Sequence, residues 1–358
     1  MTDVFFAPVK VKKLEVEATL PAKFLRMLDK VDIAKFVNGK KVCIKMHLGG
    51  NLGYTTIHPL FVRILVDKIK DCGGHPFVCD QSTKDIEKRG YTKQTFNCGI
   101  KALFGPMKKT VTVPINFKTF DTAEISETAL SADVLIVFSH VKAHGDSGFG
   151  GAGKNIAMGM VPPSTRAKMH ALEGSIDWDE AKCKKCKKCI EACPNKANKF
   201  NDKDKYEVFW HACKYCRHCI LACPEKALTT KGVNFNDFQE AMSRVVKYVL
   251  DQYGKDNVLF ISMLKDITVF CDCWGFSTPD LVPDIGMLAS KDLVAIDRAS
   301  LDLIKVENYQ PMGLPEGMEL GEGKHLFEKI HGKDPYVMQN ILEKMGVGST
   351  KYELKEVE

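Results

Sequence analysis

The chain has 358 residues, of which 45% are hydrophobic and 27% are charged, and its formal net charge is +6. This length exceeds what a single core usually needs, so we expect two domains or one large domain with an insertion. No apolar stretch approaches the roughly twenty residues of a membrane span, and the first residues lack the basic and apolar regions of a secretion signal. The sequence therefore predicts a cytoplasmic protein that does not contact a membrane.

The first part of the chain alternates between strand and helix patterns. Hydrophobic periodicity predicts strands at residues 42–46 and 76–79, with an amphipathic helix at 60–70 between them that Gly73 and Gly74 end. Such a β-α-β unit implies parallel strands with a right-handed crossover. The alternation continues with an expected helix at 92–98, strand at 110–114, helix at 123–130 and strand at 133–138. We therefore predict an α/β fold with a doubly wound, mostly parallel sheet.

A run of polar, titratable and glycine residues follows the last of these strands. In doubly wound sheets ligands bind beyond the carboxyl ends of the strands, where helix N-termini point into a crevice. His47, at the end of the first strand, could reach the same crevice. The candidate catalytic residues are His140, His144, His170 and Lys154. The candidate residues for binding a substrate or anion are Lys142, Gly150, Gly151, Gly153 and Asn155.

Residues 148–154 match the spacing G-x-x-x-x-G-K of nucleotide-binding loops. However, Asn155 stands where a Ser or Thr would hold magnesium, and the first glycine does not directly follow the strand. The pattern therefore favours an anion-binding loop with Lys154 as the counter-charge. His140 and His144, four residues apart, could hold a metal on a helix, but the glycines disfavour that and acid or base roles fit better.

The most informative pattern is a cysteine spacing that occurs twice. Residues 183–194 and 213–224 each carry C-x2-C-x2-C-x3-C-P, the spacing of bacterial ferredoxins, in which the fourth cysteine of each run ligates the other 4Fe-4S cluster. Zinc ribbons and disulfides are the alternatives, but zinc needs only four cysteines and tolerates irregular gaps. The sequence predicts two 4Fe-4S clusters. Their ligands would be Cys183, Cys186, Cys189 and Cys223 for one, and Cys213, Cys216, Cys219 and Cys193 for the other.

Positive charge is concentrated around these motifs. Residues 182–217 contain ten lysines and one arginine against four acidic residues, a balance of about +7. Much of this charge would compensate the negative clusters, and a surplus could steer an acidic redox partner such as a ferredoxin or flavodoxin. A solvated lysine-rich loop is the alternative. Nucleic acid is disfavoured, because cluster packing accounts equally well for the few interleaved aromatic residues.

The α/β pattern resumes after the cysteine motifs. We expect a long amphipathic helix at residues 236–253. The remaining expected elements are strands at 258–263, 267–271 and 293–296 and a helix at 297–304. Residues 175–231 are therefore interpreted as a small ferredoxin-like α+β insertion into one α/β domain that residues 1–174 and 232–358 form.

Cys271 and Cys273 close the strand expected at 267–271 and would share one face of it. They could ligate a metal or act as a redox pair, although a C-x-C pair is poorly shaped for an internal disulfide. Burial as small hydrophobic residues is the alternative, and it applies more strongly to the isolated cysteines. These are Cys43, Cys72, Cys79 and Cys98.

Together these segments resemble the iron-sulfur centre proteins called domain of unknown function family 362. The resemblance covers nearly the whole chain, in the family's order, at residues 44–49, 138–144, 148–159, 164–170, the double cysteine motif, 267–273 and 282–300. It implies the same fold, clusters and insertion. Because the reaction of the family is unsettled, the resemblance supplies no substrate.

We expect an oxidoreductase whose two clusters pass electrons to or from a substrate or partner at the crevice, suited to anaerobic conditions. One alternative is a non-enzymatic electron-carrier or assembly subunit of a larger oxidoreductase complex, in which the glycine loop is an interface. A further alternative is a non-redox enzyme in which the clusters are structural.

Overall fold

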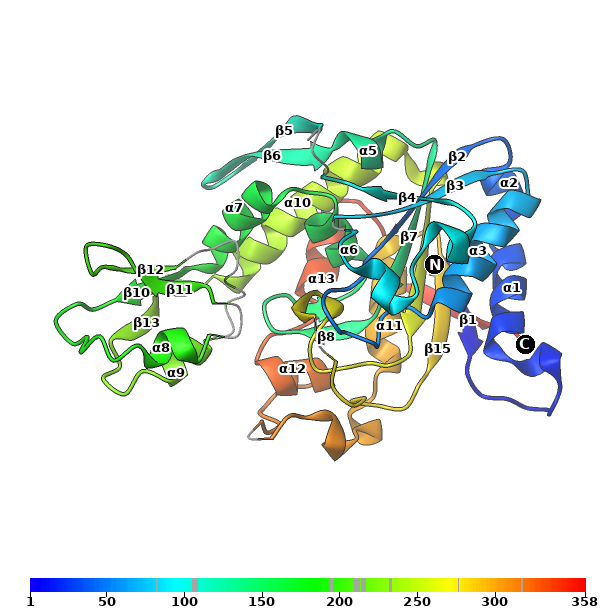
Figure 1. Ribbon diagram of the computed structural model, residues 1–358. Helices are drawn as coiled ribbons and strands as arrows, with labels where there is room; N and C mark the ends of the chain where they lie inside the picture. Colours follow the sequence, from blue (N-terminus) through cyan, green and yellow to red (C-terminus); the bar gives the residue numbers. More distant parts are fainter. Residues whose placement is uncertain are drawn as a thin grey trace.

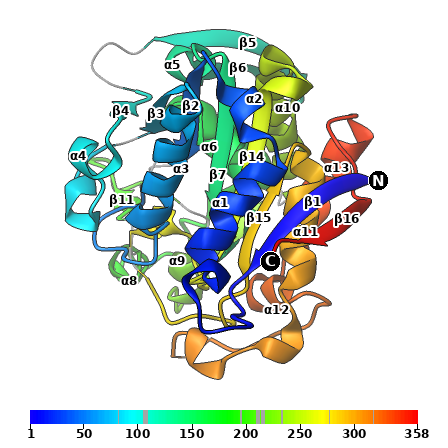
Figure 2. The same cartoon turned by 90° about the vertical axis from the view of Figure 1, so that its right-hand side faces the viewer.

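The computed structural model describes residues 1–81, 83–104, 109–193, 196–208, 213, 217–231, 234–275, 277–316 and 318–358. Its main body is built on an eight-stranded sheet in the order β16-β1-β15-β14-β7-β2-β3-β4 (Figures 1 and 2). The strands are β1 (Thr2–Pro8), β2 (Lys41–Met46), β3 (His75–Asp80), β4 (Gly99–Ala102), β7 (Val134–His140), β14 (Val258–Leu264), β15 (Gly286–Ser290) and β16 (Tyr352–Glu356). β15 runs antiparallel to both of its neighbours, and the other pairs are parallel. The predicted α/β fold with a mostly parallel sheet is confirmed.

Helices cover both faces of this sheet, so its central strands are buried on both sides. Along β7, Leu135 and Val137 face one hydrophobic core, whereas Ile136 and Phe138 face the other. This explains why the strand reads as a continuous apolar run. One face carries α1 (Leu20–Lys30), α2 (Ile33–Val37) and α3 (Pro59–Asp71). The other carries α6 (Ala152–Gly159), α7 (Pro163–Glu173), α10 (Phe235–Tyr253), α11 (Leu293–Leu303) and α13 (Val337–Lys344).

The strongly periodic elements lie where the sequence predicts them. The first β-α-β unit is β2, α3 and β3, with β2 and β3 parallel, and α10 and β14 match the expected helix and strand. The shorter elements of the main body are α4 (Lys93–Phe96), α5 (Glu127–Leu130), α12 (Leu326–His331), β8 (Lys142–His144) and β9 (Gly148–Gly150).

The strand expected at 110–114 is present as part of β5 (Thr110–Phe117), but the helix expected at 123–130 was wrong in its first half. β5 and β6 (Phe120–Ser126) form an antiparallel hairpin outside the main sheet. The helix expected at 123–130 is therefore a strand in its first half. Burial alternates along the hairpin, with Val113, Ile115 and Ala123 facing the core, and this two-residue period identifies a half-buried strand.

Two further predictions were wrong near the C-terminal half of the sheet. Residues 267–271 lie in a loop instead of a strand. The strand expected at 293–296 is the first turn of α11, where Asp292 caps the helix by accepting a hydrogen bond from the backbone N–H of Ala295 at 3.0 Å. Because this turn is buried all round, its apolar run carried no helical period.

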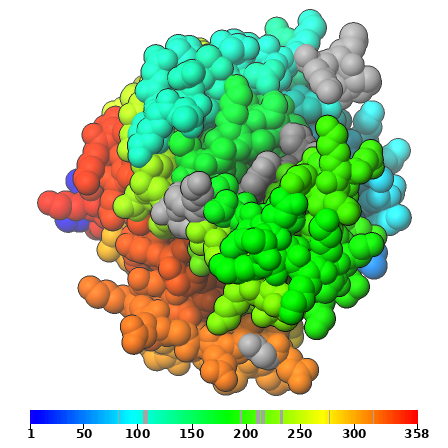
Figure 3. Space-filling view, turned by 90° about the vertical axis from the view of Figure 1, so that its left-hand side faces the viewer, coloured from blue at the N-terminus to red at the C-terminus, as the bar shows by residue number. Residues whose placement is uncertain are grey.

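We call residues 175–231 the small lobe. It contains β10 (Ser175–Trp178), α8 (Lys188–Glu191), β11 (Asn198–Phe200), β12 (Tyr206–Val208), α9 (His218–Leu221) and β13 (Leu228–Lys231). β10 pairs with β13 and β11 with β12, both antiparallel. The lobe lies to one side of the main body next to α7 and α10 (Figure 1). Figure 3 shows it in green, between the β5–β6 hairpin in cyan and the C-terminal segment in orange.

The two cysteine motifs adopt matching backbone conformations within the small lobe. Lys187 and Arg217, thirty positions apart, both have φ of 61° immediately before α8 and α9. Lys196 and Lys226, also thirty apart, have φ of 50° and 49°. The lobe is therefore an internal repeat. Among the helices of the described chain, none is long and apolar enough to cross a membrane.

Candidate functional site

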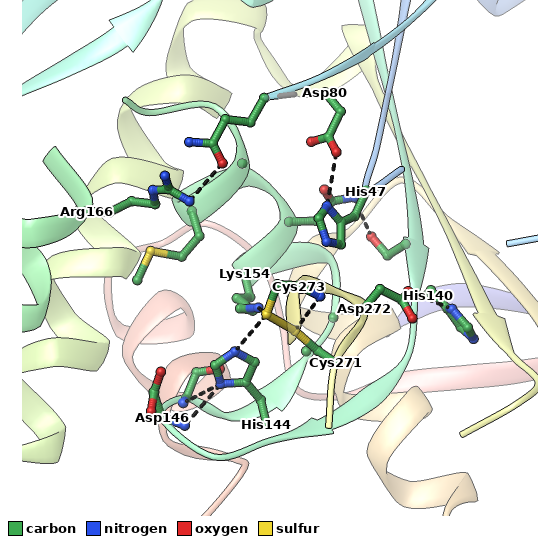
Figure 4. A pocket seen from close by; sticks show the side chains of 18 of the residues that line it. His47, Asp80, His140, His144, Asp146, Lys154, Arg166, Cys271, Asp272 and Cys273 are labelled. Atoms are coloured by element: carbon green, nitrogen blue, oxygen red, sulfur yellow. Dashed lines mark hydrogen bonds and ion pairs between the residues drawn. A yellow bond between two sulfur atoms is a disulfide. The ribbon is translucent and has the colours of Figure 1, made fainter. Parts of the chain in front are cut away.

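A cavity of about 1160 Å³, counted out to its open mouth, lies beyond the carboxyl ends of β2, β3 and β7 (Figure 4). This is where parallel sheets bind ligands, because helix N-termini and strand ends converge there. Most of its lining comes from the main body, but Cys213 of the small lobe also lines it. The titratable lining residues of the main body are Lys45, His47, Asp80, His140, His144, Asp146, Lys154, Arg166, His170, Cys271, Asp272 and Cys273.

A buried ion pair lies at the ends of β2 and β3. The Lys45 ammonium lies 3.2 Å from Asp80, and the other carboxylate oxygen of Asp80 contacts His47 Nδ1 at 3.0 Å. Burial alone would raise the pKa of Asp80, but the charges of Lys45 and His47 outweigh burial and hold it well below its usual range. Asn155 on α6 accepts a hydrogen bond from Lys45 at 2.8 Å, so this pair also fixes the helix beside the cavity.

An equivalent pair lies at the end of β7. Asp272 contacts the Lys142 ammonium at 2.6 Å and His140 Nδ1 at 3.0 Å. Burial would raise the pKa of Asp272, but the charges of Lys142 and His140 hold it well below its usual range. His140 Nε2 faces the backbone carbonyl of Lys265 at 2.6 Å, so both ring nitrogens face acceptors. His140 is therefore committed to internal contacts.

Lys142 was predicted to bind a substrate or anion, yet it is buried. Its ammonium also donates to the side chain and backbone of Thr55 at 2.7 and 3.1 Å. Its side chain is 1% exposed, so it organises the wall of the cavity instead of facing the space within.

Cys271 and Cys273 form a disulfide on the cavity wall (Figure 4). The expectation that this pair would not bridge was therefore wrong, because the chain turns into a short 3-10 helix at Asp272–Trp274 instead of extending as a strand. Lys154 Nζ lies 3.2 Å from Cys271 Sγ and 3.8 Å from Cys273 Sγ, and His144 Nε2 lies 3.7 Å from Cys273 Sγ. The ligand atoms of His144, Cys271 and Cys273 lie within 4.8 Å of one another, so these side chains would suit a metal ion only with the disulfide reduced to two thiolates.

The glycine-rich loop ends at the N-terminus of α6, where the sequence predicts an anion site. Its first amides are already occupied, because the backbone N–H groups of Ala152 and Gly153 donate to the two carboxylate oxygens of Asp297 at 2.8 and 2.9 Å. Asp297 is buried and belongs to α11. A carboxylate of the chain itself thus takes the place that a bound phosphate has in a P-loop, and Lys154 turns to the disulfide.

His170 lies on α7 and lines the cavity. Its ring stacks on Phe238 with a centroid distance of 4.8 Å, and Nδ1 lies 3.5 Å from the buried carboxylate of Glu173. Asp146 lies in the same wall, and burial together with Glu173 raises the pKa of Asp146 to about 6. His170 and Asp146 are therefore acid and base candidates in the wall of the cavity.

The structure brings most of the predicted crevice residues together. His140, His144, His170, Lys154, Gly150, Gly151 and Asn155 line the cavity. Lys142 and Gly153 do not belong to its lining; a side chain at Gly153 would contact Met338 and Asp297. Sequence reasoning did not propose Asp80 or Arg166, which lie in the wall. Asp80 could have been found, because it ends a parallel strand as His140 does.

Four of the cysteines in the small lobe lie around one cavity. Cys183, Cys186, Cys189 and Cys223, assigned to one cluster, line a single cavity of about 350 Å³, counted out to its mouth. Cys193, Cys213 and Cys219 belong to the other set, and Cys216 lies outside the described residues. Backbone N–H groups donate to Cys193 Sγ at 3.2 Å and to Cys223 Sγ at 3.3 Å, from Ala197 and Ala227 at equivalent positions of the repeat.

Residues 42–302 match the family model described as Domain of unknown function (DUF362). The chain belongs to this family. The match includes the strands that form the crevice, the cysteine motifs and the disulfide. No curated protein matches the sequence.

The solved structures that are similar over part of the chain include the two that follow. The lactate racemase apoprotein from Thermoanaerobacterium thermosaccharolyticum is 12% identical with a TM-score of 0.37, and the match covers 74% of this chain and 50% of that one. A Thermotoga maritima protein solved by the Northeast Structural Genomics Consortium is 12% identical with a TM-score of 0.38, covering 70% and 52%. The chain thus spans about half the length of both proteins, and the similarity is too weak to support an argument about function.

Proposed function

We propose that the protein is an iron-sulfur oxidoreductase in which two 4Fe-4S clusters pass electrons to or from a substrate or partner bound in the crevice. The small lobe would be the ferredoxin-like insertion into one α/β domain of residues 1–174 and 232–358. When bound, the clusters would supply one-electron transfer. We place the protein in the cytoplasm, because its thiolate ligands need a reducing compartment.

The residues of the small lobe fit a cluster at the first site. Four cysteines from two distant parts of the motif line one cavity, as the exchanged fourth ligand of two-cluster ferredoxins requires. Trp178 lines the same cavity, and its buried Nε1 has no hydrogen-bond partner among the described residues. A buried N–H without a partner is costly, and a cluster sulfide would accept its hydrogen bond.

The observation that carries the proposal is the position of Cys213. This predicted ligand of the second cluster lines the same cavity as His144, Lys154 and the Cys271–Cys273 disulfide. A cluster held there would lie against the substrate space. The first cluster, at Cys183 and Cys186, would lie further from the crevice and nearer to an external partner, since Cys186 is exposed.

An acidic partner such as a ferredoxin or flavodoxin, or an acidic patch of a larger oxidoreductase complex, would dock on the lysines of the small lobe. Ion pairs within the lobe already occupy several of these lysines, namely Lys182, Lys184, Lys185, Lys199 and Lys205. The positive charge that remains to attract a partner is therefore smaller than the +7 counted over residues 182–217 of the sequence. We expect the rate of electron exchange with such a partner to fall with increasing salt.

Anaerobic purification with iron and sulfide analysis tests this function, followed by electron paramagnetic resonance after dithionite reduction. We expect about eight irons per chain and signals of two reduced clusters. Cys186→Ser should lose one cluster, whereas Cys72→Ser, a matched change outside the motifs, should keep both. Wild-type protein without iron and without a signal after reduction would overturn the proposal.

The rival function, a carrier or assembly subunit without chemistry of its own, predicts a different response at the crevice. The cavity and its buried ion pairs favour a substrate site, since an interface does not require them. Lys154→Ala separates the two. A crevice role predicts that complex formation with a partner is retained while electron transfer beyond the clusters is lost. Loss of the complex with intact electron transfer would support the carrier.

A further inference from the structure

We propose that Cys271 and Cys273 form a redox-active disulfide, which stores a pair of electrons in the crevice as two thiols. The inference deepens the proposed function and rests on it for the electron source, a low-potential iron-sulfur centre. It is carried by the disulfide, the two proton-bearing groups beside its sulfurs, and the cysteine of the small lobe in the same cavity.

The two sulfurs differ in accessibility, as the two thiols of an exchanging pair usually do. Cys271 is buried, whereas Cys273 is partly exposed to the cavity. The backbone N–H of Cys273 donates to Cys271 Sγ at 3.4 Å. Cys273 is therefore the sulfur that a molecule in the crevice would reach first, with Cys271 as its resolving partner.

Lys154 supports the reduced form. Its ammonium lies 3.2 Å from Cys271 Sγ and 3.8 Å from Cys273 Sγ, at the N-terminal end of α6. Positive charge beside a sulfur stabilises the thiolate that appears when the disulfide opens. The first backbone N–H groups of α6 already donate hydrogen bonds to Asp297. At this end of the helix, it is therefore the Lys154 side chain that faces the sulfurs.

His144 is held in the tautomer that donates to sulfur. The backbone N–H groups of Asp146 and Ser147 both donate to His144 Nδ1, each at 3.1 Å. Nδ1 is therefore an acceptor, and the proton of the neutral ring lies on Nε2, which faces Cys273 Sγ at 3.7 Å. A metal ligand would need the opposite arrangement, with Nδ1 donating and Nε2 free for the ion. The local backbone thus favours a hydrogen bond from Nε2–H to the sulfur over metal binding.

The step balances as a two-electron, two-proton reduction. Two electrons, delivered one at a time, enter the S–S bond and break it. Two protons from solvent in the open crevice convert the two sulfurs to thiols, while the Lys154 ammonium and the His144 Nε2–H keep their protons and stabilise the thiolates as they appear. The iron-sulfur centre is oxidised by one electron in each transfer. The reverse reaction releases two protons to solvent and two electrons, one at a time, to the iron-sulfur centre, and restores the disulfide.

Differential alkylation with peptide mass spectrometry tests the proposal on the full-length, anaerobically purified protein. Oxidised protein should give a Cys271–Cys273 peptide without N-ethylmaleimide labels, and protein reduced with methyl viologen should give two labels. Reductive titration of the Cys271→Ser, Cys273→Ser double variant should consume two electrons fewer per chain than wild type, because one disulfide takes up two.

Lys154→Met tests the role of the ammonium. Without it we expect the labelled fraction to rise only at more negative potentials, because the nascent thiolate loses its counter-charge. Lys168→Met, which changes an exposed lysine on α7, is the matched control and should leave the midpoint unchanged.

Two results would overturn the proposal. One is a fully labelled peptide in oxidised protein, or equal electron uptake by wild type and the double variant. The other is one zinc per chain that the double variant loses, which would identify a metal site. If only the proposed function is wrong, the result is different. Iron analysis and paramagnetic resonance then detect no clusters, while the Cys271–Cys273 peptide still changes between unlabelled and doubly labelled forms.

Discussion

Lys45 and Lys142 each hold an ammonium group inside the protein, and each is paired with an aspartate at the edge of the sheet. Asp80 and Asp272 both accept from a lysine and a histidine. Removing one partner of such a pair costs far more than removing an exposed pair, because the remaining charge stays buried. These pairs therefore fix the wall of the crevice in one arrangement.

Asp80→Asn tests this at the residue scale. The substitution removes the negative charge opposite Lys45, whose side chain is fully buried. We expect the free energy of unfolding to fall by about 3–5 kcal/mol, measured by urea denaturation. Asp251→Asn is the control, because Asp251 pairs with Lys247 four residues earlier on the surface of α10, where about 0.3–0.5 kcal/mol is expected. Equal losses in the two variants would contradict burial as the cause.

At the scale of elements, α6 depends on one glycine and one distant carboxylate. Gly151 precedes the helix, and a Cβ there would meet the Phe149 ring and lie 2.5 Å from Asp297 Oδ1. Phe149 and Asp297 come from β9 and α11. A glycine is therefore required because three elements approach one another closely, and this approach brings Lys154 to the disulfide.

Gly151→Ala should displace Asp297 from the amides of α6. We expect a loss of about 1–3 kcal/mol in the free energy of unfolding, as for other over-packed sites. Gly99→Ala is the matched control in β4, because its nearest neighbour would be Phe77 Cβ at 3.9 Å. Thermal denaturation of both variants measures this difference in stability. A Gly151→Ala protein as stable as Gly99→Ala would exclude the close approach as the reason for the glycine.

At the scale of the whole molecule, the main body and the small lobe are stabilised differently. The main body has two extensive cores, one on each face of the sheet. Among the described residues of the small lobe, the buried core comprises Cys189, Cys219 and Leu228, with a few partly buried neighbours. The apolar core that these residues form is too small to hold a lobe together alone, so we expect ligation at the cysteines to supply much of its stability.

Removing iron should therefore unfold the small lobe and spare the sheet. We expect limited proteolysis of chelator-treated protein to cleave within residues 175–231, while the circular dichroism of the main body persists. Untreated protein handled in parallel is the control. A small lobe that resists protease equally well with and without iron would show that side-chain packing alone stabilises it.

The sequence by itself determined the α/β alternation and the paired cysteine motifs, because both are local. Periodicity reports which side chains are buried along a single element, and each cysteine motif is a spacing within one short segment of the sequence. For this reason β2, α3, β3, α10 and β14 could be predicted. Where burial is complete or a turn intervenes, as in α11 and the β5–β6 hairpin, periodicity misleads.

Only the tertiary structure decided what each crevice residue does. Lys142 and Asp272, or Gly153 and Asp297, are more than a hundred positions apart, and no local pattern reports such contacts. The same holds for Lys154 beside Cys271 and for Cys213 at the cavity. The sheet brings these residues to one edge because parallel strands end together. Tertiary packing therefore places Lys142, which the sequence predicts to bind an anion, in a buried ion pair, and it joins Cys271 and Cys273 in a disulfide.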